Sequence, residues 1–300
     1  MKYTIPEREI MCSGHKACQG CGATIAMRYA LKALGPRTIL AIPACCWAVI
    51  DGPFPYSAAG VPLFHCAFET AAVTASGIRA GLDARGEKDV NVVAWAGDGG
   101  TFDIGIQALS GTVERNDNII YFCYDNEAYM NTGVQRSSST PWGAVTSTTP
   151  ARHFKQERKK DMMAIMAAHG IPYTASASIA YPEDFIKKIE KAMSIQGSKF
   201  IHVLATCPPG WRASPDISVQ LARLAVQTHV FPLYEIYEGK YYKLSMDPQK
   251  KPITDYMKPQ GRFRHLTEDQ VKEMDRQIDE RYAWLKELAE RSRPWFENKK

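Results

Sequence analysis

Four of the eight cysteines have a spacing that suits metal binding. Cys18 and Cys21 form a Cys-x-x-Cys pair, Cys46 follows them, and Cys207 stands directly before Pro-Pro-Gly-Trp. Two cysteines at the first spacing can bind one metal centre from a single turn. Four thiolates are the usual ligand set of a [4Fe–4S] cluster, but the same set also binds zinc. The residues alone therefore predict a metal centre and leave iron–sulfur and zinc open.

A second motif, Gly97-Asp98-Gly99-Gly100, has the residue types of a diphosphate site. It comes between an apolar run that predicts a strand (90–96) and a segment that predicts a helix (103–113). Glycines let the backbone turn sharply and approach a ligand closely, and a helix N-terminus offers free N–H groups to a phosphate. Asp98 adds a carboxylate oxygen of the kind that Mg²⁺ binds together with diphosphate oxygens. Alone, the motif is equally well explained as a tight turn.

A third segment, Asp125-Asn126-Glu127-Ala128, strengthens the interpretation of a metal site. It follows the next predicted strand (118–124), so both motifs lie at the carboxyl ends of neighbouring strands, where α/β proteins bind ligands. Asn126 offers an amide oxygen, and the main-chain carbonyl of Ala128 offers another. With Asp98 these groups predict a magnesium–diphosphate site, and the simple tight turn becomes the weaker alternative.

The elements that must position these motifs alternate between strand and helix, which predicts an α/β fold with a mostly parallel sheet flanked by helices. Further helices are expected over 23–34, 68–82, 161–169 and 182–195, and further strands over 38–44 and 199–205. A long Ser/Thr/Gly/Pro stretch (131–150) predicts a functional or mobile loop. A final amphipathic helix is expected from Thr267, with Gln270 placed for a capping box.

Composition and charge narrow the classes of protein. Hydrophobic residues make up 45% of the 300 residues and charged residues 23%, which is ordinary for a globular protein. The net charge of +5 comes without a dense basic stripe, so we expect no nucleic-acid role. No apolar segment is long enough to span a bilayer and no signal peptide is recognised, so a cytoplasmic protein without membrane attachment is expected. We predict an α/β domain over residues 1–235 and a basic C-terminal extension over residues 236–300.

The pairing of residues 97–100 with residues 125–133 resembles the thiamine diphosphate motif. More closely, it resembles the β subunit of pyruvate:ferredoxin oxidoreductase and of related 2-oxoacid:ferredoxin oxidoreductases, and the likeness extends through most of the chain. The resemblance implies the thiamine diphosphate-binding fold, with Mg²⁺ held by Asp98, Asn126 and the Ala128 carbonyl. It further implies that Gly97, Gly99 and Gly100 line the diphosphate, and that Asn131 is the catalytic residue facing the reacting centre.

The same resemblance implies that Cys18, Cys21, Cys46 and Cys207 bind a [4Fe–4S] cluster within the 1–235 domain, with Cys46 also contacting the cofactors. The thiamine-type pattern does not support the alternative of a thioredoxin-like redox pair. One departure is Cys45, where the family usually has a small residue. The third ligand could therefore be argued either way, and we assign Cys46.

The implied function is that of a β subunit in a thiamine-dependent oxidoreductase that converts pyruvate, coenzyme A and oxidised ferredoxin to acetyl-CoA, CO₂ and reduced ferredoxin. The implied partners are α-, γ- and δ-type subunits and ferredoxin. Branched-chain 2-oxoacids and oxalate are alternative substrates. Two other classes stay open, namely a non-redox thiamine decarboxylase subunit with structural zinc and an iron–sulfur scaffold subunit without thiamine. The residues name neither the substrate nor the physiological direction.

Overall fold

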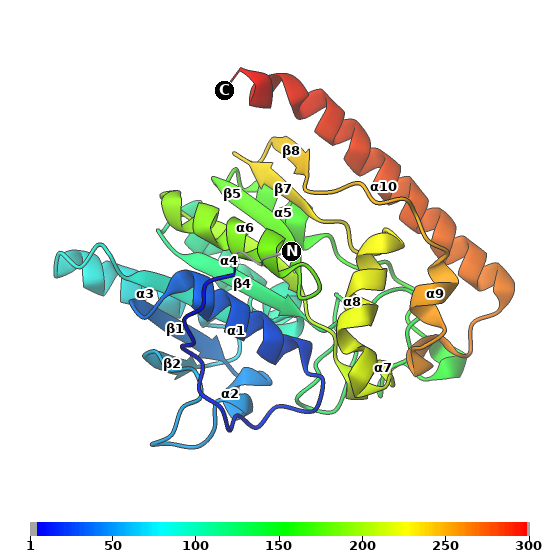
Figure 1. Cartoon of the computed structure of the whole chain (residues 1–300), viewed down its shortest axis with the longest axis horizontal. Coiled ribbons are helices and arrows are strands. Elements are labelled where there is room, and N and C mark those ends of the chain that lie inside the picture. Colours follow the sequence, from blue (N-terminus) through cyan, green and yellow to red (C-terminus); the bar gives the residue numbers. More distant parts are fainter. Residues whose placement is uncertain (1–4, 299–300) are drawn as a thin grey trace.

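The predicted apolar runs pair into one eight-stranded sheet. The computed structural model describes residues 5–298 of the chain, and its strands follow the order β2-β1-β3-β4-β6-β5-β7-β8 (Figure 1). The pairs from β2 through β5 are parallel, and β7 and β8 are antiparallel. The strands are β1 (Thr38–Pro43), β2 (Leu63–Cys66), β3 (Asn91–Gly97), β4 (Ile120–Asp125), β5 (Tyr173–Ser178), β6 (Lys199–Leu204), β7 (Tyr234–Tyr237) and β8 (Tyr241–Leu244). The prediction of a mostly parallel α/β sheet is confirmed.

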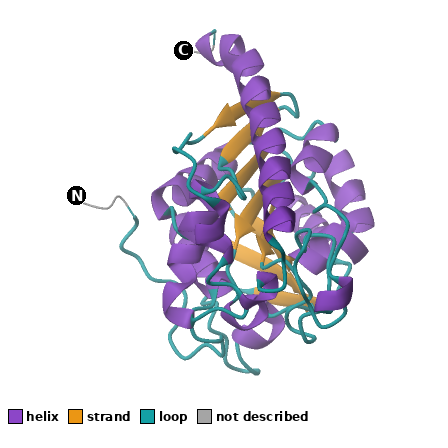
Figure 2. Ribbon diagram, turned by 90° about the vertical axis from the view of Figure 1, so that its right-hand side faces the viewer, coloured by secondary structure: helices purple, strands orange, loops and turns teal. Residues whose placement is uncertain are grey.

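Helices cover both faces of this sheet (Figure 2). They are α1 (Gly22–Leu34), α2 (Trp47–Ile50), α3 (Ala71–Ala84), α4 (Ile106–Glu114), α5 (Met162–Ala168), α6 (Pro182–Ser194), α7 (Pro208–Trp211), α8 (Ser218–Gln227), α9 (Ile253–Met257) and α10 (Glu268–Glu297). Short 3₁₀ turns span Ala151–His153, Pro215–Ile217 and Gly261–Phe263. None of the helices within residues 5–298 combines the length and apolar character that crossing a bilayer requires.

The side chains on the two faces of each central strand pack into two different hydrophobic cores, one on each side of the sheet. Trp95 of β3 and Phe122 of β4 point to the face covered by α1 and α6. The alternate positions Ala94 and Tyr121 point to the face covered by α3, α4 and α5. Because successive side chains of a strand point to opposite faces, these buried strands read as continuous apolar runs rather than as alternating ones.

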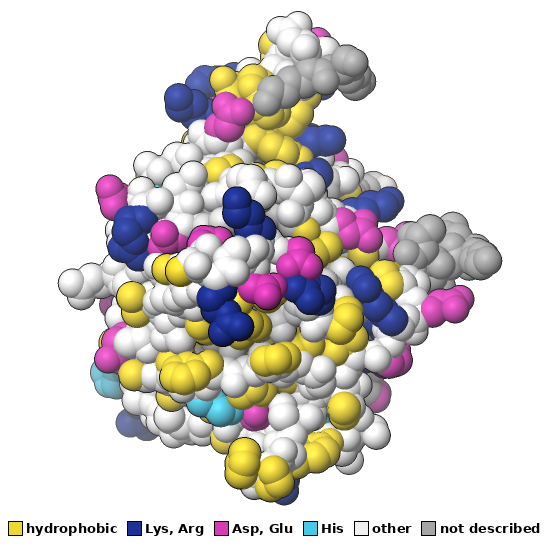
Figure 3. All heavy atoms as spheres, turned by 90° about the vertical axis from the view of Figure 1, so that its left-hand side faces the viewer, with side chains coloured by type: hydrophobic (Ala, Val, Ile, Leu, Met, Phe, Trp, Pro, Cys, Tyr) yellow, Lys and Arg dark blue, Asp and Glu magenta, His cyan; other side chains and the backbone are white. Residues whose placement is uncertain are grey.

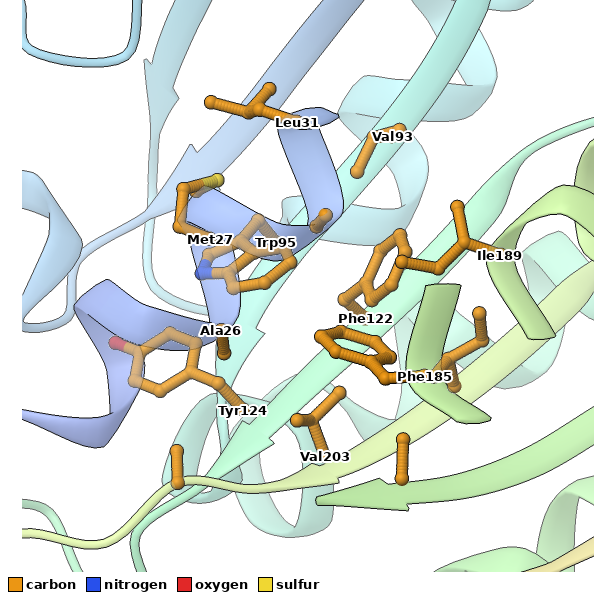
Figure 4. Close-up of a cluster of buried hydrophobic side chains, with 14 of the residues drawn as sticks. Ala26, Met27, Leu31, Val93, Trp95, Phe122, Tyr124, Phe185, Ile189 and Val203 are labelled. Atoms are coloured by element: carbon orange, nitrogen blue, oxygen red, sulfur yellow. The ribbon is translucent and has the colours of Figure 1, made fainter. Parts of the chain in front are cut away.

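Aromatic side chains fill the core beneath α1 and α6 (Figure 4). The rings of Trp95 and Phe122 lie 5.0 Å apart between centroids, and Phe122 meets Phe185 of α6 edge-on at 6.3 Å. All three side chains are fully buried. This packing fixes the carboxyl ends of β3 and β4, where the two predicted motifs begin.

The structure differs from the expectation in several elements: β2, β7, β8 and α8 were not predicted, and two further differences have a clear physical reason. The segment after residue 100 begins with a π-helical turn (Gly100–Ile104) and becomes α-helical only at Ile106. In addition, β5 was not predicted, because its sequence Tyr-Thr-Ala-Ser-Ala-Ser is small and partly polar. The strand is nevertheless fully buried. Ser176 compensates its burial by donating to the carbonyl of Pro232 at 2.7 Å, whereas Thr174 Oγ1 finds no hydrogen-bond partner among the described residues.

The C-terminal segment is continuous with the sheet. The expected boundary between residues 235 and 236 lies inside β7, and β8 pairs with β7. The helix expected from Thr267 is confirmed as α10: Thr267 Oγ1 accepts a hydrogen bond from the Gln270 amide, and the Gln270 side chain accepts one from the Thr267 amide. The backbone N–H of Tyr242 in β8 donates to Ser292 Oγ of α10 at 2.9 Å. The division into two domains stays a prediction.

Substitution of Phe122 by alanine should destabilise the chain by about 3–5 kcal/mol, because it leaves a cavity in a fully buried aromatic cluster. The matched control is Phe64→Ala in the edge strand β2, where the side chain is 57% exposed; we expect a change within about 0.5 kcal/mol. Urea unfolding of the purified chain, followed by circular dichroism, measures both. Equal losses in the two variants would contradict this account of the core.

Candidate functional site

The two predicted motifs meet at one edge of the sheet because β3 and β4 are parallel neighbours. Gly97, the last residue of β3, pairs in register with Tyr124 of β4. Asp98 and Asn126 therefore leave the sheet side by side.

The glycine motif turns within a space that larger side chains would not fit. A Cβ at Gly99 would lie 2.4 Å from the ring of Tyr129. The π-helical turn that follows is closed by a hydrogen bond from Gly105 N to Gly100 O at 2.9 Å, and a Cβ at Gly105 would approach that same oxygen to 2.2 Å. π-Helical turns are rare and frequently occur at functional sites.

Three potential oxygen ligands converge beside this turn. One of the two terminal positions of the Asn126 side-chain amide, which can hold either its oxygen or its nitrogen, lies 2.9 Å from Asp98 Oδ1 and 3.0 Å from the Ala128 carbonyl oxygen. With nitrogen in that position, the amide donates a hydrogen bond to both oxygens. With oxygen in that position, a carboxylate, an amide and a carbonyl oxygen face one point, which is the donor set that Mg²⁺ binds. Rotation of the Asn126 amide by about 180° thus replaces a set of internal hydrogen bonds by a site for a cation. These residues therefore fit the implied magnesium ion.

The environment of Asp98 also favours a cation. The side chain is fully buried and accepts a hydrogen bond from Ser137 Oγ at 2.5 Å. Burial, and after it the neighbouring Asp125 carboxylate, raise the pKa of Asp98 well above its usual range. A divalent cation beside Asp98 would offset this cost of ionisation.

Asp125 differs from Asp98 because its oxygens already have protein partners. Its carboxylate accepts from Ser139 Oγ at 2.7 Å and from Lys159 Nζ at 2.6 Å, and it lies 2.7 Å from His202 Nε2. Burial alone would raise the pKa of Asp125, but Lys159 and His202 outweigh burial and hold that pKa well below its usual range. Asp125 therefore anchors the 125–128 loop and leaves metal binding to its neighbours.

Sequence reasoning missed these supporting residues. Ser137 and Ser139 belong to the long 131–150 loop, whose buried positions show that it packs into the site. Lys159 and His202 come from other parts of the chain. The one available signal was a histidine inside the apolar strand β6, where a buried polar side chain needs a partner.

Short contacts bring the cysteine segments together. Gly22 N, directly after Cys21, donates to Thr206 O, directly before Cys207, at 2.9 Å. Trp47 Nε1, directly after Cys46, donates to Ala23 O at 3.2 Å. Cys21, Cys46 and Cys207 each directly precede a helix, respectively α1, α2 and α7.

Two of the four predicted thiols, Cys46 and Cys207, have raised pKa values to which neighbouring cysteines contribute. Burial first, with the nearby thiols Cys21 and Cys18 adding to it, raises the pKa of the Cys207 thiol to about 12. Burial likewise raises the pKa of Cys46, and after it Cys45, Cys207 and Cys21 contribute in that order. All eight cysteines are free thiols. Across residues 5–298, no three His, Cys, Asp or Glu side chains are grouped as ligands of one metal ion.

Cys45 and Cys46 differ in exposure and in some of their neighbours, although both line one pocket. Cys45 is buried, and its thiol contacts Tyr124 of β4. Cys46 is partly exposed and is influenced by Cys21 and Cys207.

One pocket joins the two kinds of site. Cys46, Asp98, Asn126, Ala128 and the exposed Asn131 all line it, together with Ala44, Cys45, Phe68, Gly97, Gly99, Tyr124, Tyr129, Met130 and Thr132. The other predicted residues lie outside this lining: Gly100, Cys18, Cys21 and Cys207. A Cβ at Gly100 would lie 3.2 Å from the ring of Phe68.

Comparisons with known proteins find relatives among thiamine pyrophosphate enzymes and 2-oxoacid oxidoreductase subunits. Residues 53–203 match the family described as "Thiamine pyrophosphate enzyme, C-terminal TPP binding domain". The ketoisovalerate oxidoreductase subunit VorB of Pyrococcus furiosus is 54% identical, over 96% of this chain and 96% of that protein. The pyruvate synthase subunit PorB of Methanothermobacter marburgensis is 52% identical, over 92% of this chain and 96% of that protein.

A solved structure shares the fold. It is a 2-oxoglutarate:ferredoxin oxidoreductase from Magnetococcus marinus, with a TM-score of 0.58 and 22% identity. The match covers 74% of this chain and 81% of that one.

Asp98→Asn should weaken Mg²⁺-dependent binding of thiamine diphosphate by at least about 100-fold, because it removes the carboxylate ligand of the three-oxygen site. Isothermal titration of the assembled protein with thiamine diphosphate, with and without Mg²⁺, measures this. Asp117→Asn, near the opposite end of β4, is the control and should bind normally. An unchanged affinity in Asp98→Asn would show that the carboxylate is not a ligand.

Cys46→Ser should lose the iron of the candidate cluster, roughly four atoms per chain, whereas Cys45→Ser should keep it. The reason is that Cys46 is partly exposed with Cys207 and Cys21 nearby, whereas Cys45 is buried against Tyr124. Iron analysis of the two anaerobically purified variants decides between them. Iron loss confined to Cys45→Ser would reverse the assignment.

Proposed function

The chain belongs to the β-subunit family of thiamine pyrophosphate-dependent 2-oxoacid:ferredoxin oxidoreductases, and we propose that this subunit joins 2-oxoacid decarboxylation to the first electron transfer. Its proposed reaction converts pyruvate, coenzyme A and oxidised ferredoxin to acetyl-CoA, CO₂ and reduced ferredoxin. The observation that carries the proposal is the shared pocket, because Asp98, Asn126 and Ala128 line it together with Cys46.

Asp98, Asn126 and the Ala128 carbonyl would hold Mg²⁺, and Gly97, Gly99 and Gly100 would give the diphosphate close access to the backbone. When bound, thiamine diphosphate supplies the electron sink for loss of CO₂ from a 2-oxoacid. Asn131 is exposed in the same pocket, where its amide can orient the substrate.

Cys18, Cys21, Cys46 and Cys207 would hold a [4Fe–4S] cluster. A single zinc ion draws its thiolates to about 3.8 Å from one another, given Zn–S bonds of about 2.3 Å in a tetrahedron. A four-iron cluster separates them further. We assign the cluster rather than zinc because ferredoxin accepts electrons singly, and redox-inactive zinc cannot pass them on. The start of α1, directly after Cys21, adds partial positive charge beside that thiolate.

The surface beside the pocket supports assembly with another subunit. Large apolar side chains are exposed around α2, β2 and α3, on the face that Figure 3 displays. They include Val49, Phe54, Phe64 and Val73, with Phe54 97% exposed. Such patches mark interaction sites. The proposed partners of α, γ and δ type would cover this face and provide the coenzyme A site, further clusters and the carboxylate that activates thiamine.

Relatives of two substrate classes are nearly equally similar to this chain. The ketoisovalerate relatives are 53–54% identical and the pyruvate synthase subunit named above is 52% identical. A branched-chain 2-oxoacid is therefore the second candidate substrate, while oxalate stays an untested alternative. The free thiols suit a reducing compartment, which supports the proposed cytoplasmic location.

The experiment is to purify the assembled complex anaerobically and to follow viologen reduction with pyruvate, 2-oxoisovalerate or oxalate. We expect coenzyme A-dependent reduction with kcat/KM at least about tenfold higher for one of these 2-oxoacids, since even one or two methylenes in a pocket change discrimination by that amount. The chain purified alone should be inactive, and Asp98→Asn is the negative control within the complex. The proposed function would be refuted if the complex bound Mg²⁺ and thiamine diphosphate but none of the 2-oxoacids supported viologen reduction.

A further inference from the structure

A buried arginine from the C-terminal segment joins the two parts of the proposed site. Arg262 lies in the 3₁₀ turn Gly261–Phe263 and is 2% exposed. On one side, its guanidinium lies 2.6 Å from Glu127 Oε2. On the other, it stacks over Trp211, with its central carbon 4.0 Å from the ring centroid.

Glu127 stands between the proposed magnesium ligands Asn126 and Ala128. Its backbone has a φ of +70°, a conformation that non-glycine residues seldom adopt and that surrounding contacts must hold. The buried carboxylate has two cationic partners, since Lys159 Nζ lies 3.0 Å from Oε1 and Arg262 lies beside Oε2. The Arg262 contact is an ion pair without the alignment of a hydrogen bond.

Trp211 connects Arg262 to the cysteine side. Trp211 is the last residue of α7, and its backbone N–H donates to Cys207 O at 2.8 Å. Its indole Nε1 donates to Asn126 O at 2.9 Å. Arg262 thus touches the 125–128 loop directly through Glu127, and it touches the helix that follows Cys207 through Trp211.

Neighbours hold the guanidinium in this place. Arg262 Nε donates to Gln260 Oε1 at 2.9 Å, and Arg262 donates a further hydrogen bond to Tyr256 Oη at 3.2 Å. Gln260 and Tyr256 are themselves buried. The position of this permanent charge is therefore fixed, and water screens it little.

We propose that Arg262 is a positioning residue that clamps the 125–128 loop against α7 and whose buried positive charge raises the reduction potential of the cluster bound at Cys207. The proposal rests on the proposed cluster site. One-electron reduction adds one negative charge to a cluster, so a fixed cation nearby favours the reduced form and a fixed anion favours the oxidised form. Arg262 and Glu127 therefore act on the potential with opposite signs.

The test is redox titration of the assembled complex, monitored by electron paramagnetic resonance. The relevant signal is defined as the one that is missing in Cys207→Ser. Arg262→Gln should make the reduction equilibrium of that signal about tenfold less favourable, a fall of about 59 mV for one electron. Glu127→Gln should shift the potential upward, and the double variant should lie near the wild type. Arg262→Lys keeps the charge and should also stay near the wild type.

Arg264→Gln is the matched control, because Arg264 is two residues away and exposed; it should cause no shift. A clamp without an electrostatic role would weaken thiamine diphosphate binding in Arg262→Gln without opposite shifts in the two single variants. Shifts of the same sign, or none, would overturn the inference while leaving the proposed function intact. If Cys207→Ser lost no signal and no iron, the proposed cluster site itself would fail. If Arg262→Gln does not assemble, the other two variants still test the inference. Glu127→Gln should raise the reduction potential, and Arg262→Lys should leave it unchanged.

Discussion

The carboxylate of Asp125 has no access to solvent, and the geometry of the site depends on the contacts that compensate its charge. It accepts hydrogen bonds from Ser139 and Lys159 and lies against His202. It also accepts a hydrogen bond from the backbone N–H of Glu127 at 2.9 Å. Removing one partner of a buried pair typically costs about 3–5 kcal/mol, because the other charge stays buried and uncompensated. The contacts tie the end of β4 to β6, to the 131–150 loop and to the segment around Lys159. The loop that presents Asn126 and Ala128 is consequently rigid before any ligand binds.

The cysteine segments follow a related principle, with backbone hydrogen bonds in place of ion pairs. The segments before α1, α2 and α7 are far apart in the sequence, yet each contacts another through groups adjacent to the cysteines. Gly22 makes this approach possible, because a Cβ there would lie 2.5 Å from Thr206 N. The backbones of these segments therefore carry the contacts, and the cysteine side chains are not needed for them. Trp211 and Arg262 then connect this assembly to the 125–128 loop.

Much of the fold followed from local sequence. The strands ending before Asp98 and Asn126 were predicted within one or two residues, because both are long apolar runs bounded by glycine or polar residues. The capping box at Thr267 was predicted because its hydrogen bonds join residues three apart. The strand β5 escaped prediction because burial of small polar residues depends on partners elsewhere, such as Pro232 for Ser176. The π-helical turn escaped it because its Gly105–Gly100 hydrogen bond leaves no periodic pattern.

By itself, the sequence determined which atoms are available: the oxygens of Asp98, Asn126 and Ala128, the four thiols, and the glycines that allow close approach. Residue type and spacing carry this information because ligand chemistry is local. Only the tertiary structure showed that Cys45 is buried against Tyr124 whereas its neighbour Cys46 is partly exposed. It alone brought Lys159, His202 and Arg262 to the 125–128 loop. A buried charge is stabilised by whichever groups the packing places within about 3 Å, and that distance is unrelated to separation along the chain.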